Sequence, residues 1–555
     1  MRSEVQLMRK NSDSKLIILA AAGFLAFAAF AAAQTATAPD PKAVALRGAY
    51  GPFRANNDLL SYDLDIRVDP EAKAWSGKNT IRFRMLKEDA RIQLDLKAHL
   101  TVEKITLDGA PLPFTREYDA VFVDFPEPLK KDSVTAIDFY FSGRASGEKD
   151  WGGITFKTDP AGRPWITTAC QGSGAMTWWP NKEQQRDEVE RMGLRVAVPN
   201  GLVDVSNGRF AGRTDLGDGY TRWDWEVHYP INNYNVALNI AAYVHFEDRM
   251  DGLTLDYYCL PENLEKAKVQ FAQARTTIEC FEKYFGPYPF PEDGYKLIEV
   301  PYAGMEHQSA VAYGNRFLNG YLERDFTGVG VSLKFDYIII HESAHEWFGN
   351  SITAADVCDE WIHEAWATYM EGLYVEHLFG YEDAVKYLNG YRPKVKNERP
   401  IIGPPDVHYN APQDMYFKGA LFLNTLRHIV DDEAKWRTLL RGFYDRFKYQ
   451  NIGSEDAFAF LNVETGLNLG PVFDQYLRRT TIPALELKLD EAAGSVSFRW
   501  KSEVPGFDMP VKAGRRGQWL TLRPSAEWQT MKTDLKKDEF EVADDLFYID
   551  VVRID

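Results

Sequence analysis

The sequence predicts an α+β protein of several domains, because the spacing of its apolar residues changes twice along 555 residues. Between residues 59 and 244, apolar and polar side chains alternate, which is the period of half-buried strands. From Leu264 onward, apolar residues recur every three or four positions, which is the period of helices. After Pro483 the alternation returns. The expected order is an N-terminal antiparallel β domain, a mostly helical domain and a small C-terminal β domain.

The first 34 residues are predicted to be a signal peptide. Basic residues precede an apolar run at residues 16–33, and the alanines that end this run suit a cleavage site. An exported protein, periplasmic or secreted, is therefore expected, and an uncleaved membrane anchor is the alternative. Residues 35–48, which start with a stretch rich in proline and alanine, are predicted to be a linker.

Three domains are expected after the linker. Residues 49–250 are predicted to form a β sandwich or saddle, and residues 251–482 a mainly helical domain. The first helix of the second domain is expected at residues 264–285, because Gly286-Pro287 is a stop signal. Residues 483–555 are predicted to form a small β domain. The alternating segments that support the β domains are residues 60–68, 81–85, 134–141, 194–198, 485–489 and 496–500.

The segment His341-Glu342-Ser343-Ala344-His345 predicts a catalytic metal site on a helix. Histidines at positions i and i+4 project from one helix face, at the separation that two ligands of one tetrahedral zinc ion need. Glu342 lies on the same turn, where a carboxylate can take a proton from water that the metal activates. The segment therefore predicts two metal ligands and a general base.

The third metal ligand is predicted to be Glu364, which follows His345 after eighteen intervening residues. Residues 361–371 read as a helix, and a glutamate near its start can present a carboxylate to the same metal. This ligand set leaves the fourth position for water and substrate, as in a catalytic zinc site. The histidine helix is expected to continue through Phe348 and to stop at Gly349. We therefore expect a metallopeptidase with one Zn²⁺ per chain.

With Glu346-Trp347-Phe348-Gly349-Asn350 after the second histidine, this spacing resembles the M1, or gluzincin, family of zinc aminopeptidases. The resemblance covers nearly the whole chain after the signal peptide. It implies a thermolysin-like catalytic domain that removes the N-terminal residue of peptides. The large C-terminal helical domain of bigger members is expected to be absent, because 65 residues remain after residue 490. The cleft is then expected to be more open, or covered by an oligomeric partner.

A second segment, Ala303-Gly304-Met305-Glu306-His307, is similar to the Gly-x-Met-Glu-Asn exopeptidase motif of that family. The resemblance implies that Glu306 binds the free α-amino group of the substrate, with Gly304 and Met305 beside it. A carboxylate near the zinc suits this role, because an aminopeptidase must recognise a cation one residue before the scissile bond. Ala303 and His307 depart from the motif and leave its carboxylate intact.

Two weaker similarities complete the expected site. Tyr416, followed by Phe417-Lys418-Gly419, resembles the family tyrosine that stabilises the tetrahedral intermediate, and a phenol donor suits a developing oxyanion. Gln171 is similar to a family glutamine that reaches from the N-terminal domain into the pocket for the first side chain. The alternative interpretation of Gln171 is a glycine-rich hairpin without such a role.

The composition excludes some partners. A formal net charge of −17 argues against nucleic acid and agrees with the cationic terminus of a peptide as the ligand. A membrane is expected as a partner only through an uncleaved signal segment. The cysteines have no metal-binding spacing, so either one pair is oxidised in an exported protein or all are buried thiols. They are Cys170, Cys259, Cys280 and Cys358.

Two other functions use the same residues. Some relatives of the family also hydrolyse lipid epoxides at the same zinc, although no residue of this chain points to that reaction. The other alternative is a catalytically silent protein that binds peptides or serves as a scaffold. Such a protein is expected to lose a ligand, the base or the oxyanion donor, and all of them are present here. Aminopeptidase activity is therefore the expected function.

Overall fold

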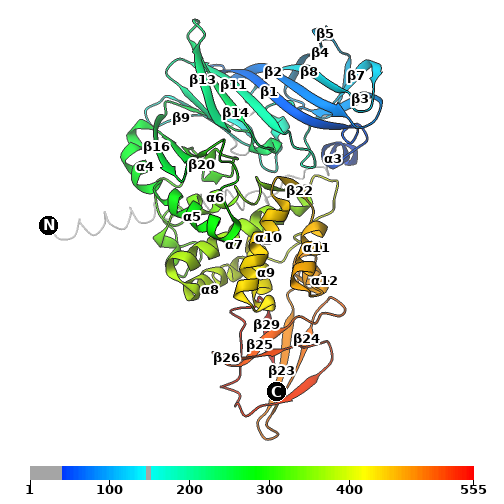
Figure 1. Ribbon diagram of the computed structural model, residues 1–555, viewed down its shortest axis with the longest axis vertical. Coiled ribbons are helices and arrows are strands. Elements are labelled where there is room, and N and C mark those ends of the chain that lie inside the picture. The colour runs from blue at the N-terminus through cyan, green and yellow to red at the C-terminus, as the bar shows by residue number, and fades with distance from the viewer. Residues whose placement is uncertain (1–39, 146–151, 555) are drawn as a thin grey trace, which may run out of the picture. The chain divides into compact units, whose positions relative to one another are not determined.

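The computed structural model describes residues 40–145 and 152–554 of the chain (Figure 1). The predicted signal peptide, residues 1–34, and the start of the predicted linker lie outside these residues. The chain divides into two units at residue 45, and the description below concerns the larger unit, which begins there. Within the described ranges, no helix combines the length and the apolar character that a membrane crossing requires.

The second half of the predicted linker, residues 35–48, is helical. Residues 41–48 form α3 (Pro41–Gly48). A proline is well tolerated in the first turn of a helix, where its missing N–H has no helical partner. Alanine and leucine in the following turn then favour a helix over an extended linker.

The N-terminal β domain is built around an eight-stranded sheet, which is antiparallel except for the parallel pair β1 and β11. The predicted alternation is visible in β1, where Leu64, Ile66 and Val68 are buried between more exposed neighbours. In sheet order the strands are β13 (Arg209–Asp215), β14 (Tyr220–Val227), β11 (Arg191–Pro199), β1 (Asn57–Asp69), β2 (Ala74–Met85), β8 (Val134–Arg144), β4 (Thr101–Leu107) and β5 (Ala110–Pro111).

Two smaller sheets complete this domain, and one of them leads into the candidate site. In a four-stranded sheet, β10 is an inner strand, and the residues that follow it in the chain include Gln171. The sheets are β12 (Val203–Ser206), β15 (Leu238–Ala241), β10 (Pro164–Ala169) and β9 (Gly153–Thr158), and β3 (Asp89–Asp95), β7 (Ala120–Leu129) and β6 (Phe114–Glu117).

A five-stranded sheet crosses the predicted boundary at residues 250 and 251. Its strands β16 and β17 form a hairpin whose turn residues, Asp251 and Gly252, both have positive φ, at 48° and 91°. Asp-Gly is the preferred pair for such a two-residue turn, so the boundary falls on a hairpin turn and not between domains. The strands are β16 (Val244–Met250), β17 (Leu253–Cys259), β18 (Tyr295–Glu299), β20 (Val311–Tyr313) and β19 (Gly304–Met305).

The helical domain begins with two helices where one was expected. Phe271 and Ala272 interrupt the helix but keep right-handed backbone angles, so the apolar face continues across the break. The helices of this domain are α4 (Leu264–Gln270), α5 (Gln273–Phe285), α6 (Tyr337–Ala344), α7 (Trp361–Phe379), α8 (Tyr381–Asn389), α9 (Asp414–Val430), α10 (Glu433–Phe447), α11 (Ser454–Thr465) and α12 (Gly470–Leu477). A short pair, β21 (Ile352–Ala354) and β22 (Gln450–Ile452), lies among them.

Asp336 sets the start of α6, the helix that carries the histidine motif. Its side chain accepts hydrogen bonds from the backbone N–H groups of Ile338 and Ile339, which otherwise have no helical partner. Gln270 and Tyr313 also donate to this carboxylate, each at 2.6 Å. Burial raises the pKa of Asp336 to about 6, although these bonds oppose the shift. The start of α6 is therefore tied to α4 and to the five-stranded sheet.

The histidine helix ends earlier than the sequence predicted. It stops at Ala344, the next three residues form turns, and Phe348 forms an isolated bridge with Ile352. His345 nevertheless keeps a right-handed backbone, with φ −64° and ψ −18°, so its side chain remains one turn above His341. Gly349, at φ 122°, makes the sharp reversal that other residues rarely adopt.

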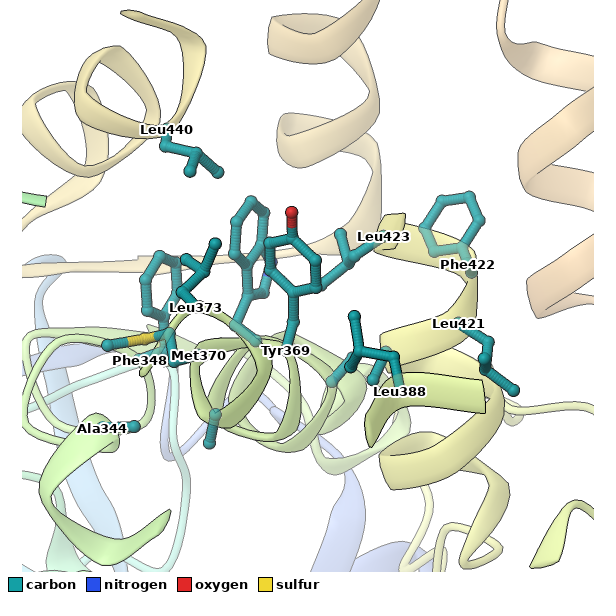
Figure 2. Close-up of a cluster of buried hydrophobic side chains, with 14 of the residues drawn as sticks. Ala344, Phe348, Tyr369, Met370, Leu373, Leu388, Leu421, Phe422, Leu423 and Leu440 are labelled. Carbon is teal, nitrogen blue, oxygen red and sulfur yellow. The ribbon is translucent and has the colours of Figure 1, made fainter. Parts of the chain in front are cut away.

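Helix α7 is the centre of the hydrophobic core of the helical domain. Figure 2 shows its Tyr369, Met370 and Leu373 among side chains of neighbouring helices. One turn below them, the Trp366 ring stacks on the Phe348 ring at a centroid distance of 4.6 Å and lies 4.9 Å from another ring, on α10. Residues 361–375 of α7 are all buried, which fixes the position of Glu364 within the domain.

The chain ends in a small β module that shares the core of the helical domain. Two sheets form it, and the last strand runs parallel to β23. Figure 1 shows the helices between the large sheet and this module, so the predicted α+β order is confirmed. The strands are β27 (Gln529–Lys532), β24 (Ser495–Lys501), β23 (Ala484–Asp490) and β29 (Asp550–Arg553), and β26 (Gln518–Leu522), β25 (Val511–Arg515) and β28 (Glu541–Val542).

Replacing Trp366 by alanine is expected to lower the free energy of unfolding by about 3–5 kcal/mol, because it removes a fully buried ring from a stacked cluster. Guanidinium denaturation followed by circular dichroism measures the change. Val463→Ala is the control, because Val463 is 76% exposed and its loss should change stability by less than about 0.5 kcal/mol. Equal effects of the two substitutions would contradict this description of the core.

Candidate active site

Helices α6 and α7 bring the three predicted metal ligands together. The Nε2 atoms of His341 and His345 lie 3.3 Å apart. Oε2 of Glu364 lies 3.6 Å from the first nitrogen and 3.3 Å from the second. Ligand atoms about 2.0–2.1 Å from a tetrahedral zinc ion are about 3.4 Å apart, so the spacing matches such an ion.

The hydrogen bonds of the histidines support a metal at this point. Nδ1 of His341 lies 2.7 Å from Oε1 of Glu371, and Nδ1 of His345 lies 2.9 Å from the carbonyl oxygen of Phe348. Both partners are acceptors, so each Nδ1 carries the proton and each Nε2 of the neutral rings directs a lone pair inward. Oε2 of Glu364 has no hydrogen-bond partner among the described residues. Three facing lone pairs repel one another, and a cation between them removes that repulsion.

Glu371 holds the predicted metal ligand His341 through a hydrogen bond, and the sequence alone did not identify it. Its second oxygen accepts hydrogen bonds from the hydroxyl groups of Tyr387, at 2.7 Å, and Tyr391. The carboxylate is fully buried, so these donors and the ring of His341 are what stabilise its charge. A signal was available in the sequence, because Glu371 follows Glu364 by seven residues and therefore lies on the same face of α7.

Glu342, the predicted general base, lies beside the metal ligands. One of its carboxylate oxygens and ligand atoms of His345 and Glu306 all lie within 4.8 Å of one another. Burial raises the pKa of Glu342 to about 8. A divalent cation at this distance would lower that pKa again. A Cβ atom on Gly304 would lie 2.6 Å from Oε1 of Glu342, so only glycine lets β19 pass this close.

Two donors from the N-terminal β domain hold the carboxylate of Glu306. Nε2 of Gln171 lies 2.8 Å from Oε1 of Glu306 and 3.0 Å from Oε1 of Glu364. The hydroxyl group of Tyr234 donates to the same oxygen of Glu306 at 3.1 Å. Gln171, whose similarity to the family was the weakest among the predicted site residues, is therefore in direct contact with Glu306 and Glu364.

His363 fixes the direction in which Tyr234 donates. Nε2 of His363 accepts the backbone N–H of Ala354 at 2.7 Å, so in the neutral ring Nδ1 carries the proton. Nδ1 lies 3.3 Å from the Tyr234 oxygen, which leaves the hydroxyl proton for Glu306. Burial lowers the pKa of His363 to about 3 and keeps the ring neutral. Neither Tyr234 nor His363 was predicted, because nothing in the sequence places residue 234 near residue 306.

Tyr416 lies on the first turn of α9 with its ring 5.9 Å from that of His341. It is half-buried, unlike the metal ligands, so it lies at the edge of the buried cluster. Burial, with the charge of Glu364, raises the pKa of Tyr416 well above its usual value. The hydroxyl group is therefore a proton donor at neutral pH.

The two departures from the exopeptidase motif have different surroundings. Ala303 packs against the core and accepts a backbone hydrogen bond from Gly314 at 2.8 Å. Met305 is buried in β19, where it pairs with Ala312. His307 is fully buried, and neither ring nitrogen has a partner within the described ranges. Burial lowers the pKa of His307 to about 3, so the ring is neutral. His307, which stands where the motif has asparagine, therefore leaves Glu306 in place.

All four cysteines are buried, unpaired thiols. The alternative of an oxidised pair therefore does not apply to this structure.

Comparison with known proteins finds peptidase family models that match this chain. Residues 59–234 match the model described as "Peptidase M1 N-terminal domain", and residues 269–476 match "Peptidase family M1 domain". The two matches together cover most of the chain. The chain therefore belongs to peptidase family M1.

Similar curated proteins include aminopeptidase N of Lactobacillus delbrueckii subsp. lactis, 24% identical over 462 residues, which are 78% of this chain and 52% of that protein. Aminopeptidase B of Rattus norvegicus is 25% identical over 460 residues, which are 74% of this chain and 66% of the relative. The chain spans about half the length of most of the curated relatives it matches.

Among solved structures, a mutant M1 zinc metallopeptidase of Deinococcus radiodurans, bound to a Tyr-Ser-Ala substrate, is similar in fold. Its TM-score is 0.61 at 20% identity, and the match covers 76% of this chain and 94% of that one.

Glu371→Gln is expected to weaken binding of a divalent metal about 10- to 100-fold, because an amide cannot accept from both His341 and the two tyrosines. Competition with a chromophoric chelator measures the affinity. Glu382→Gln removes the same charge from an exposed position on α8 and is expected to bind metal as the wild type does. Unchanged affinity in Glu371→Gln would show that His341 needs no such support.

Proposed function

We propose that the protein is a zinc-dependent aminopeptidase. The observation that carries the proposal is the position of Glu306, whose carboxylate lies within one cluster with Glu342 and His345. A metal site alone supports hydrolysis of many bonds. A buried carboxylate beside it, held by Gln171 and Tyr234, supports recognition of a substrate cation at a fixed distance from the reacting bond.

The buried charge of Glu306 supports an ammonium group as its partner. The side chain is 3% exposed, and burial raises its pKa. Its hydrogen-bond donors are neutral groups, which orient the carboxylate without neutralising it. A free α-amino group carries a positive charge and would offset the cost of keeping the carboxylate ionised. An endopeptidase, which binds amide groups on both sides of the scissile bond, has no use for such a group.

His341, His345 and Glu364 would hold the zinc ion, which supplies Lewis-acid polarisation of the scissile carbonyl and a lowered pKa of water. Glu342 takes the proton of the attacking water and passes it to the leaving amine. Tyr416 donates a hydrogen bond to the carbonyl oxygen as negative charge develops there. These roles need no further ionisable group near the reacting bond.

Glu342→Gln is expected to lower kcat for an aminoacyl-arylamide by about 10²-fold or more, because an amide cannot accept the proton of water. Release of the arylamine, followed by fluorescence, measures the rate. Zinc content determined on the same samples is the control, because Glu342 is not a ligand. Full activity in the variant would exclude Glu342 as the base.

Glu306→Gln is expected to raise KM for substrates with a free amino group by about tenfold or more, because a charge-assisted hydrogen bond is lost. The wild type is expected to leave an N-acetylated arylamide uncleaved. Equal cleavage of free and acetylated substrates would contradict the proposal and indicate an endopeptidase. Zinc binding without turnover of any substrate would favour the silent peptide-binding protein or the epoxide hydrolase instead.

A further inference from the structure

A pocket opens beside the proposed amine site and contains a buried acid that the mechanism does not use. Its lining includes Cys170, Gly172, Tyr234 and Glu360. We propose that this pocket receives the side chain of the first substrate residue, and that the carboxylate of Glu360 selects arginine and lysine. The proposal rests on the aminopeptidase function above and names its substrate class.

The location of the pocket follows from the residues that hold Glu306. Cys170 and Gly172 flank Gln171, whose side chain bonds Glu306. Tyr234 lines the pocket and donates its hydroxyl proton to the same carboxylate. The pocket wall and the amine site therefore consist of the same two segments. A side chain on the α-carbon next to the bound amino group lies within reach of this space.

Glu360 is the acid in this pocket that has no partner. It is 7% exposed, yet no hydrogen bond or ion pair of its carboxylate occurs among the described residues. The charged groups that act on it are Glu364, Glu306 and Asp356, all of them acids. Burial, with these charges, raises the pKa of Glu360 to about 8. An unpaired buried acid is costly, and a cation in the pocket would remove this cost.

The other charges of the pocket are already balanced. The charge of Arg47 favours the ionised form of Glu183, and Glu183 also accepts the backbone N–H of Met176 at 2.7 Å. Asp356 pairs with Arg186 at 3.1 Å and accepts the backbone N–H of Cys358.

His408 also lines the pocket, and burial lowers its pKa to about 4, so it is neutral. Glu360 is thus the one acid of the lining without a compensating cation among the described residues.

The position of Glu360 on the chain couples it to the reaction centre. It lies one turn before Glu364, at the start of α7, and the backbone N–H of Glu364 donates to its carbonyl oxygen at 3.1 Å. The carboxylate is therefore held on the same rigid helix as a metal ligand. A guanidinium or ammonium group on a long side chain would bind it while the α-amino group binds Glu306. The two positive charges of such a residue then bind two separate carboxylates, those of Glu306 and Glu360.

Matched arylamides test the charge preference directly. Arginine and citrulline have side chains of the same shape, and so do lysine and norleucine to a first approximation, but one member of each pair is neutral. The wild type is expected to hydrolyse the arginine substrate with a kcat/KM at least about tenfold above that of the citrulline substrate, the worth of one charge-assisted bond. Glu360→Gln is expected to bring this ratio close to one.

Glu265→Gln is the control, because Glu265 is an exposed acid on α4 and its loss changes the net charge equally. The ratio in this variant is expected to equal that of the wild type. Inhibition of the wild type by free arginine and by citrulline, with alanyl-arylamide as the substrate, needs no variant. Arginine is expected to inhibit at a concentration about tenfold lower than citrulline.

The outcomes separate this proposal from the function on which it rests. A wild-type arginine-to-citrulline ratio near one, with good turnover of both, would overturn the role of Glu360 and leave the aminopeptidase intact. An equal loss for all substrates in Glu360→Gln would assign Glu360 to the amine site instead of the side-chain pocket. No turnover of any free aminoacyl substrate by the zinc-loaded wild type would overturn both.

Discussion

A cluster of buried carboxylates can exist here only if cations balance it, and much of the structure serves that requirement. Glu306, Glu342 and Glu364 lie around two imidazoles, with Glu360 and Glu371 a short distance away, and all five are buried. Like charges at this separation, out of contact with water, repel one another strongly. A divalent ion between the histidines and Glu364, an ammonium group at Glu306 and a basic side chain at Glu360 would neutralise them in turn.

The N-terminal β domain completes the site rather than merely covering it. Gln171 and Tyr234 orient Glu306, and neither belongs to the helical domain that carries the metal ligands. The same region supports the turn after α6, because Asn232 and Asn235 donate to Gly349 and Asn350 at 3.0 and 2.6 Å. The metal ligands therefore come from α6 and α7, whereas the proposed recognition of a substrate terminus would depend on contacts between domains.

The metal ligands could be predicted from the sequence because they lie on two helices at fixed spacings. His341 and His345 are one turn apart, and the helical period also contained a signal for Glu371 that was not used. Tyr234 and the pocket around Glu360 could not be predicted, since they arise from contacts between segments more than seventy residues apart. The structure departs from the expected elements at local breaks and edges: the helix at residues 41–48, the break between α4 and α5, and the hairpin turn at residues 251 and 252.

The central claim is that one divalent cation and one substrate ammonium group share this carboxylate cluster. Anomalous X-ray scattering at the zinc edge, from crystals of the zinc-loaded protein with a non-hydrolysable arginyl peptide analogue, tests it most directly. We expect a zinc peak bonded to His341, His345 and Glu364, with the α-amino group on Glu306. Zinc bound elsewhere, or a peptide amine away from Glu306, would contradict it.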